Sequence, residues 1–171
     1  MLQNLQVLIL RFNRFHGPLN ISLVQPSFSS LQIIDLSQNE FNGLLPTNFF
    51  QNLDAMKYAT ELSLADLLIL NRYARLIISY ESFNRDGQIS VNVTSKRSET
   101  ELQLMGTLLI FTAIDFSNNR FNGKIPQVIG ELRAVQVLNL SHNSLTGHIP
   151  PSLGNLVALE SLDFSSNKLS G

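Results

Sequence analysis

Apolar and polar residues alternate over short stretches that recur along the chain at a fixed spacing. Three stretches near the C-terminus align without gaps and end in Asn119, Asn143 and Asn167, which are 24 residues apart. Two apolar residues flank one polar residue before each asparagine, as Ile114 and Phe116 do before Asn119. This period of two predicts a short strand whose apolar side chains point into a core, while the residues between them face solvent.

Two further copies of the pattern lie near the N-terminus. They run from Leu5 to Asn13 and from Leu31 to Asn39, and their asparagines are 26 residues apart. We expect the five copies to stack, because one short strand cannot bury its own apolar face. The asparagine amide should satisfy backbone groups where the chain leaves the strand. A glycine followed by Ile-Pro or Leu-Pro should then shape the return path.

The pattern fails over residues 55–110, which we call the insertion. It contains no proline and holds six of the 12 basic and six of the 13 acidic residues. Residues 61–78 are rich in Leu, Ile and Ala and favour a helix, whereas residues 88–94 alternate and favour a strand. Residues 99–110 fit a helix or an extended chain. The predicted organisation is therefore two repeats in 1–54, the insertion in 55–110, and two full repeats and one truncated repeat in 111–171.

Composition narrows the possible functions. Of the 171 residues, 44% are hydrophobic and 15% are charged, which is typical of an ordered chain. The net charge of −1 provides no basic surface for nucleic acid. The absence of cysteine excludes disulfides, cysteine-bound metals and thiol catalysis within these residues. The histidines His16, His142 and His148 lack metal-ligand spacing, so we expect no metal and no cofactor.

The residues expected to face solvent form three columns across the stacked strands. If the insertion loops out, Asp35 and Asp115 should lie about 5 Å apart on adjacent strands. Retaining glycosidases hold two carboxyl groups at about that distance. The aspartates recur with the repeat on an open face, however, so we favour a binding surface and expect no enzyme. The first column is Ile9, Asp35, Asp115, Asn139 and Asp163; the second is Arg11, Ser37, Ser117, Ser141 and Ser165; the third is Phe12, Gln38, Asn118, His142 and Ser166.

The candidate binding residues are the polar members of these columns other than Ser166, together with four charged residues of the insertion. Three N-x-S/T sequons, at Asn20, Asn92 and Asn139, are candidate glycosylation sites. The candidates on the strands are Arg11, Asp35, Ser37, Gln38, Asp115, Ser117, Asn118, Asn139, Ser141, His142, Asp163 and Ser165, and those in the insertion are Lys96, Arg97, Glu99 and Glu101.

The repeat resembles the leucine-rich repeat in the 24-residue form of plant extracellular proteins. The tails Gly123-Lys-Ile-Pro126 and Gly147-His-Ile-Pro150 carry this resemblance. It implies an α/β leucine-rich-repeat solenoid, with short parallel strands on the concave face and irregular or 3-10 segments on the convex side. A non-repeat island, here the insertion, interrupts that solenoid.

The whole chain resembles the C-terminal part of the ectodomain of plant leucine-rich-repeat receptor-like proteins. In that family an island interrupts the array several repeats before its end. The matching stretches here are 91–96, 99–102 and 111–119, and Arg97 stands where the family usually has glycine. The family's signal peptide, cysteine-bearing caps and membrane helix have no counterpart in these residues, so we expect a fragment.

This resemblance implies a function in recognition. The ligand would be a peptide, a glycan or a protein, and residues 111–171 would face a coreceptor kinase ectodomain. The receptor would lie on the extracellular side of the plasma membrane, held by a segment that this chain lacks, and would signal through partner kinases, mainly in defence. The alternative is a soluble inhibitor or scaffold of the cell wall, which an uninterrupted array would favour.

Overall fold

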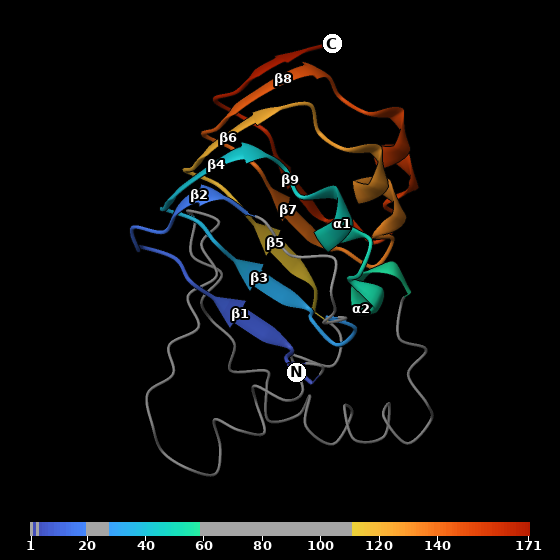
Figure 1. Ribbon diagram of the computed structural model, residues 1–171. Helices are drawn as coiled ribbons and strands as arrows, with labels where there is room; N and C mark the ends of the chain where they lie inside the picture. Colours follow the sequence, from blue (N-terminus) through green and yellow to red (C-terminus); the bar gives the residue numbers. More distant parts are fainter. Residues whose placement is uncertain (1, 3, 20–27, 59–110) are drawn as a thin grey trace, which may run out of the picture. The chain divides into compact units, whose positions relative to one another are not determined.

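The strand at the start of each repeat pairs with the same strand of the neighbouring repeats in the computed structural model (Figure 1). The structure describes residues 2, 4–19, 28–58 and 111–171. All pairs are parallel, and the register aligns Ile9 with Asp35, Asp35 with Asp115, Asp115 with Asn139 and Asn139 with Asp163. The predicted solenoid of short parallel strands is therefore confirmed. Its first sheet contains, in spatial order, β1 (Val7–Ile9), β3 (Ile33–Asp35), β5 (Ala113–Asp115), β7 (Val137–Asn139) and β9 (Ser161–Asp163).

A second parallel sheet forms from the residues that follow each asparagine. The pattern of apolar residues did not predict this sheet, because each of these strands has at most one core side chain, such as Phe121 or Leu145. Stacking repeats of nearly equal length brings their backbone groups opposite one another and so pairs them. Gly123 and Gly147, with φ of 73° and 82°, allow the left-handed turn toward the Ile-Pro tail. The strands are β2 (His16–Pro18), β4 (Glu40–Leu44), β6 (Arg120–Gly123), β8 (Ser144–His148) and β10 (Lys168–Ser170).

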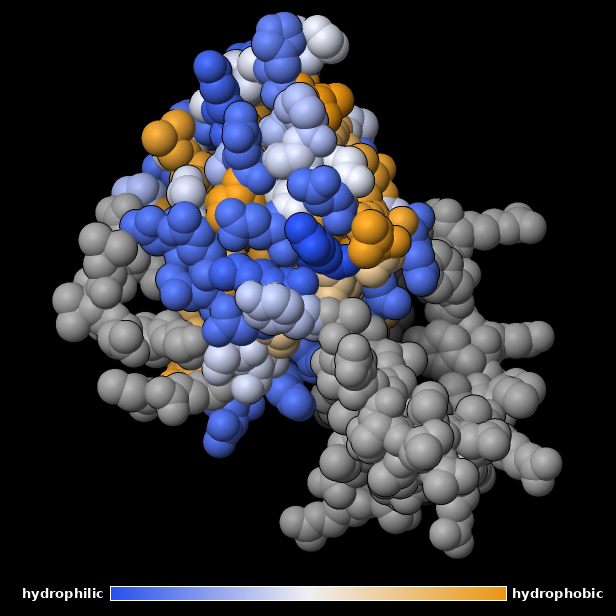
Figure 2. Space-filling model, turned by 90° about the vertical axis from the view of Figure 1, so that its right-hand side faces the viewer, coloured by the Kyte–Doolittle hydropathy of each residue, from blue (hydrophilic) through white to orange (hydrophobic). Residues whose placement is uncertain are grey.

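Short helical segments complete the repeats on the side opposite the first sheet. Proline precedes three of them, at Pro46, Pro126 and Pro150, because its fixed φ suits a helix start and its missing N–H removes it from a strand. Figure 2 shows this side, where hydrophilic side chains dominate the described surface and hydrophobic ones form small separate patches. The segments are α1 (Thr47–Phe50), α2 (Asp54–Lys57) and the 3-10 helices η1 (Gln127–Glu131) and η2 (Pro151–Asn155).

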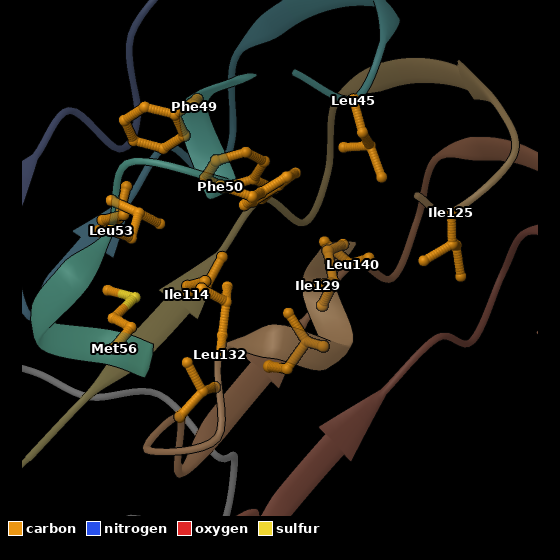
Figure 3. Packing of buried hydrophobic residues seen from close by; sticks show 14 of the residues in the cluster. Leu45, Phe49, Phe50, Leu53, Met56, Ile114, Ile125, Ile129, Leu132 and Leu140 are labelled. Carbon is orange, nitrogen blue, oxygen red and sulfur yellow. The ribbon is translucent and has the colours of Figure 1, made fainter. Parts of the chain in front are cut away.

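The core lies between the two sheets and the helical segments. Phe50, Leu53 and Met56 gather near Ile114 (Figure 3), and all four side chains are fully buried. A row of phenylalanines crosses the repeats as well. The rings of Phe41 and Phe121 stack at 6.2 Å between centroids, and the ring of Phe15 stacks on that of Phe41 at 5.9 Å. The apolar positions of the repeat thus form one continuous core along the stack.

The repeats on either side of the insertion stack directly on one another. Strand β3 pairs with β5 in register, and the buried Met56 accepts a hydrogen bond at its carbonyl oxygen from the N–H of Ala134. The helix predicted over 61–78, the strand over 88–94 and the stretch 99–110 lie outside the described residues. The proposed boundaries of the insertion likewise remain predictions.

The asparagine that ends each first-sheet strand links two repeats. Asn119 is 8% exposed, and its Oδ1 accepts a hydrogen bond of 3.0 Å from the N–H of Phe41 in the preceding repeat. Its Nδ2 donates to the carbonyl oxygens of Leu36, at 2.9 Å, and Ser117, at 3.1 Å. Asn39, Asn143 and Asn167 make the equivalent bonds. The expectation that this amide satisfies the backbone at the turn is confirmed.

The close approach of η1 and η2 gives a test of this packing. A Cβ atom built on Gly130 would lie 2.2 Å from the carbonyl oxygen of Ser152, whereas one built on Gly154 would have no neighbour within 4 Å. We expect Gly130→Ala to lower the free energy of unfolding by about 2 kcal/mol, because backbone must move apart. Gly154→Ala should change it by less than about 0.5 kcal/mol. Urea denaturation would measure both, and equal effects would contradict the close packing.

Candidate binding surface

The outward face of the first sheet holds the three columns of side chains between the core positions. In the first column, Asp35 and Asn139 use Oδ1 to accept two hydrogen bonds each. Asp35 accepts from the backbone N–H of Ser37 at 3.0 Å and its hydroxyl at 2.6 Å, and Asn139 accepts from Ser141 at 3.0 Å and 2.8 Å. An aspartate or an asparagine therefore serves equally well to hold the turn that follows the strand.

Asp115 occupies the middle of the first column. Its Oδ1 accepts a hydrogen bond of 2.9 Å from the N–H of Ser117, and its Oδ2 accepts one of 3.3 Å from Nδ2 of Asn139. On the other side it lies in register with Asp35. The two carboxylates that prompted the comparison with glycosidases thus lie side by side, and each also holds the turn of its own repeat.

The serines of the second column lie deeper than the sequence pattern predicts. Ser37, Ser117 and Ser141 are 7%, 4% and 3% exposed, so the prediction that they face solvent is wrong. Strands about 5 Å apart leave little room between side chains, so short side chains between two flanking repeats are easily buried. Ser165, in the last repeat, is exposed as expected. Whether any of the four serines contacts a ligand stays a prediction.

The third column has an unusual backbone conformation. Phe12, Gln38, Asn118, His142 and Ser166 all have φ between 52° and 56°, in the left-handed region. Asparagine adopts this conformation readily, whereas bulky side chains rarely do. All of these side chains except the half-buried Asn118 are exposed, so this column presents the most accessible side chains of the face.

The first repeat presents apolar groups that the candidate residues did not include. Ile9 is 42% exposed and Phe12 is 67% exposed. Between them, Arg11 lies 3.9 Å from Oδ2 of Asp35 and 5.9 Å from the centre of the Phe12 ring. The signal was visible in the sequence, because Ile9 and Phe12 break two columns that are otherwise polar.

Two aspartates of the first column have pKa values shifted in opposite directions. Burial raises the pKa of Asp115 above its ordinary 3.8, and the charge of Asp35 raises it further, against the hydrogen bonds from Ser117 and Asn139. The backbone N–H of Ser165 lowers the pKa of the more exposed Asp163. The hydrogen bonds to Asp115 therefore do not fully compensate the burial of its charge.

This shift predicts that Asp115→Asn stabilises the chain. Because the folded chain binds the Asp115 proton more tightly than the unfolded chain, Asp115 contributes less stability as pH rises from its ordinary 3.8 through its raised pKa. Asparagine can hold the same turn, as Asn139 does, without burying a charge. Above the raised pKa we expect a gain of about 1 kcal/mol in the free energy of unfolding, and a smaller gain as pH falls.

The measurement is urea denaturation of both proteins over a series of pH values. Asp163→Asn is the matched control, since the lowered pKa of Asp163 predicts a small loss of stability at neutral pH that disappears on acidification. An Asp115→Asn variant that is less stable than the original chain at neutral pH would contradict the assignment.

The remaining candidate residues are Asn139, which lies in β7, and six residues outside the described part of the chain. Asn139, the third sequon, lies half-buried in β7 with both its amide oxygen and its amide nitrogen hydrogen-bonded. Outside the described residues lie Asn20, Asn92, Lys96, Arg97, Glu99 and Glu101.

Among the described residues, no group of three or more His, Asp or Glu side chains could hold a metal ion, and no helix is long and apolar enough to cross a bilayer.

Known proteins share both the sequence and the fold. The leucine-rich-repeat family models match residues 111–169 and 30–52. Receptor-like proteins 19 and 34 of Arabidopsis thaliana are 47% and 45% identical over 129 residues, which span 75% of this chain and 12% of each relative. The chain thus covers about an eighth of the length of these relatives.

Solved structures agree on the fold. A plant peptide hormone receptor, RGFR1 in complex with RGF2, superimposes with a TM-score of 0.57 and 24% identity, over 98% of this chain and 18% of that one. Pollen Receptor Kinase 3 gives the same TM-score with 23% identity, over 99% of this chain and 54% of that one. At this level of identity the likeness establishes the fold.

Proposed function

Because this chain belongs to the plant leucine-rich-repeat receptor-like proteins, we propose that it is a ligand- and partner-binding segment of an extracellular receptor. The outward face of the first sheet carries this proposal. Its inward positions are apolar in every repeat, whereas the third column, which is largely exposed, has a different residue in each repeat, from Phe12 to Ser166. A rigid sheet with a constant apolar inner face and variable exposed side chains is suited to recognition rather than to chemistry.

We propose a peptide as the first ligand class to test. The hormone receptor that shares the fold is described in complex with RGF2, which supports the idea that such a repeat array can hold a peptide. Residues 111–171 would contact a coreceptor kinase ectodomain, and the receptor would act at the extracellular side of the plasma membrane in defence signalling. These assignments follow from the resemblance to the receptor-like protein family.

Peptide selection on the purified 171-residue chain tests the binding surface. A random peptide library displayed on phage would be selected on the chain, and the enriched peptides would be synthesised. We expect Gln38→Ala with His142→Ala to weaken their binding about tenfold, because both side chains are exposed on the outward face. Glu131→Gln, on the exposed side of η1, is the control and should change nothing. If the peptides bind the Gln38→Ala, His142→Ala variant as tightly as the original chain, the proposal is refuted.

Replacing residues 59–110 with a short Gly-Ser linker tests the contribution of the insertion. Since β3 and β5 pair directly, we expect this variant to fold. Its free energy of unfolding should rise by about 2 kcal/mol, because closing a shorter loop costs less entropy. If the insertion helps to recognise the ligand, as Lys96, Arg97, Glu99 and Glu101 would allow, the variant should lose binding while keeping its circular dichroism spectrum. Full retention of binding would remove the insertion from the proposal.

The proposed role of the receptor in defence signalling can be tested in leaf cells. A membrane-anchored form of the chain would be expressed in leaves, and a selected peptide would be applied. A burst of reactive oxygen that requires a coreceptor kinase would support defence signalling. Altered growth without such a burst would assign the chain to development instead.

A further inference from the structure

The first repeat differs in chemistry from the four that follow it on the outward face. Where they have aspartate or asparagine in the first column, it has Ile9, and where they have polar residues in the third, it has Phe12. Both side chains are substantially exposed, at 42% and 67%. Aromatic and arginine side chains of this kind dominate the energetics of binding surfaces.

The stability of the fold does not account for Phe12. Its φ of 56° is a conformation that a bulky side chain adopts at a cost, and with most of the side chain in water little burial offsets that cost. Arg11 lies over one face of the ring, at 5.9 Å from its centre, which leaves the rest of the ring open. The ring and Ile9 together form an apolar step at one end of the face.

Negative charge adjoins this step. Ile9 is in register with Asp35, and Asp35 is in register with Asp115. The three columns carry three carboxylates and one guanidinium, that of Arg11, which lies 3.9 Å from Asp35. Within these described columns the carboxylates outnumber the guanidinium by two, so a cation arriving at the middle of the face would be attracted to it.

We infer that the ligand is a peptide with an apolar side chain that packs on Ile9 and Phe12 and an arginine or lysine that pairs with Asp35 and Asp115. This inference rests on the proposed function and specifies its ligand. Neighbouring strands lie about 4.8 Å apart, so a peptide crossing them would travel about 5 to 10 Å from the apolar step to the aspartates. An extended peptide covers about 6.6 Å in two residues and points both side chains to the same face, so the basic residue follows or precedes the apolar one by two positions.

Selected peptides and two matched double variants test this chemistry. We expect the enriched peptides to share an apolar and a basic residue two positions apart. Asp35→Asn with Asp115→Asn removes the charge and keeps the turns, as Asn139 shows, and should weaken binding about tenfold. Ile9→Asn with Phe12→Ser gives the first repeat residues found in the other repeats and should weaken binding to a similar degree.

The salt dependence of binding distinguishes the ionic contribution of the aspartates from the apolar contribution of Ile9 and Phe12. Raising the sodium chloride concentration from 20 mM to 500 mM should weaken binding to the original chain, and should have little effect on what binding the double-asparagine variant retains. The Glu131→Gln control should behave like the original chain in both buffers.

The outcomes distinguish this inference from the function on which it rests. Enriched peptides without a basic residue, or equal affinity for the double-asparagine variant, would overturn the inference. The proposed function would still stand if their binding depended on Gln38 and His142. Selection that yields no peptide whose binding depends on the outward face would overturn both.

Discussion

Asn119→Ala should lower the free energy of unfolding by about 3 kcal/mol. The change removes the oxygen that accepts from the N–H of Phe41 and the nitrogen that donates to the carbonyl oxygens of Leu36, Phe116 and Ser117. Alanine leaves these buried groups without the partner that the amide provides, and an unpaired buried polar group costs about 1 to 3 kcal/mol. The side chain also joins two repeats, so their stacking weakens with it.

Asn13→Ala is the control for this prediction. Asn13 has the same place in its repeat but is exposed, and its Nδ2 donates only to the carbonyl oxygens of Leu10 and Arg11 within its own repeat. Water can replace those bonds, so the loss should be about 0.5 to 1 kcal/mol. Urea denaturation followed by circular dichroism would measure both. Equal losses would show that the inter-repeat bonds of Asn119 add little.

Phe121→Ala should have the largest effect of any single change proposed for the core, about 4 kcal/mol. The Phe121 side chain is fully buried, and its ring centre lies 6.2 Å from that of Phe41 and 5.6 Å from that of Phe116. Alanine would leave a cavity at the place where the second sheet packs against the core. Two of the stacked ring contacts would disappear with the side chain.

The control is Phe12→Ala, which removes the same number of atoms from a side chain that is 67% exposed. We expect it to change the free energy of unfolding by less than about 0.5 kcal/mol. Thermal and urea denaturation should rank the two variants in the same order. A loss below about 1 kcal/mol for Phe121→Ala would mean that the neighbouring rings close over the gap.

The first sheet and the asparagine bonds could be predicted because they depend on local pattern and exact spacing. Ile114 and Phe116 alternate with Asp115, and the asparagines recur at a fixed interval, so the strand, its inward face and the bonded turn all follow from the sequence. The second sheet depends instead on register between repeats. Nothing in the sequence of β6 (Arg120–Gly123) is typical of a strand except Phe121.

Two features of the binding surface depend on neighbours that a single stretch of sequence does not reveal. Ser117 is a polar residue next to a strand, and its burial in the folded chain does not follow from its own stretch of sequence. The left-handed conformation at Phe12 and His142 comes from the turn that every repeat makes, although the bulky Phe12 side chain does not favour it. Ile9 and Phe12 could have been selected as candidates, because they break a repeated polar pattern.

The pairing of β3 with β5 has a consequence for how such a protein diversifies. These two strands keep their register although residues 59–110 are inserted in the chain between the two repeats to which they belong. A gene can therefore lengthen, shorten or exchange the intervening cassette without disturbing the scaffold that carries it. New specificity can then arise by swapping a block of sequence, which a solenoid altered by point mutation alone would reach only slowly.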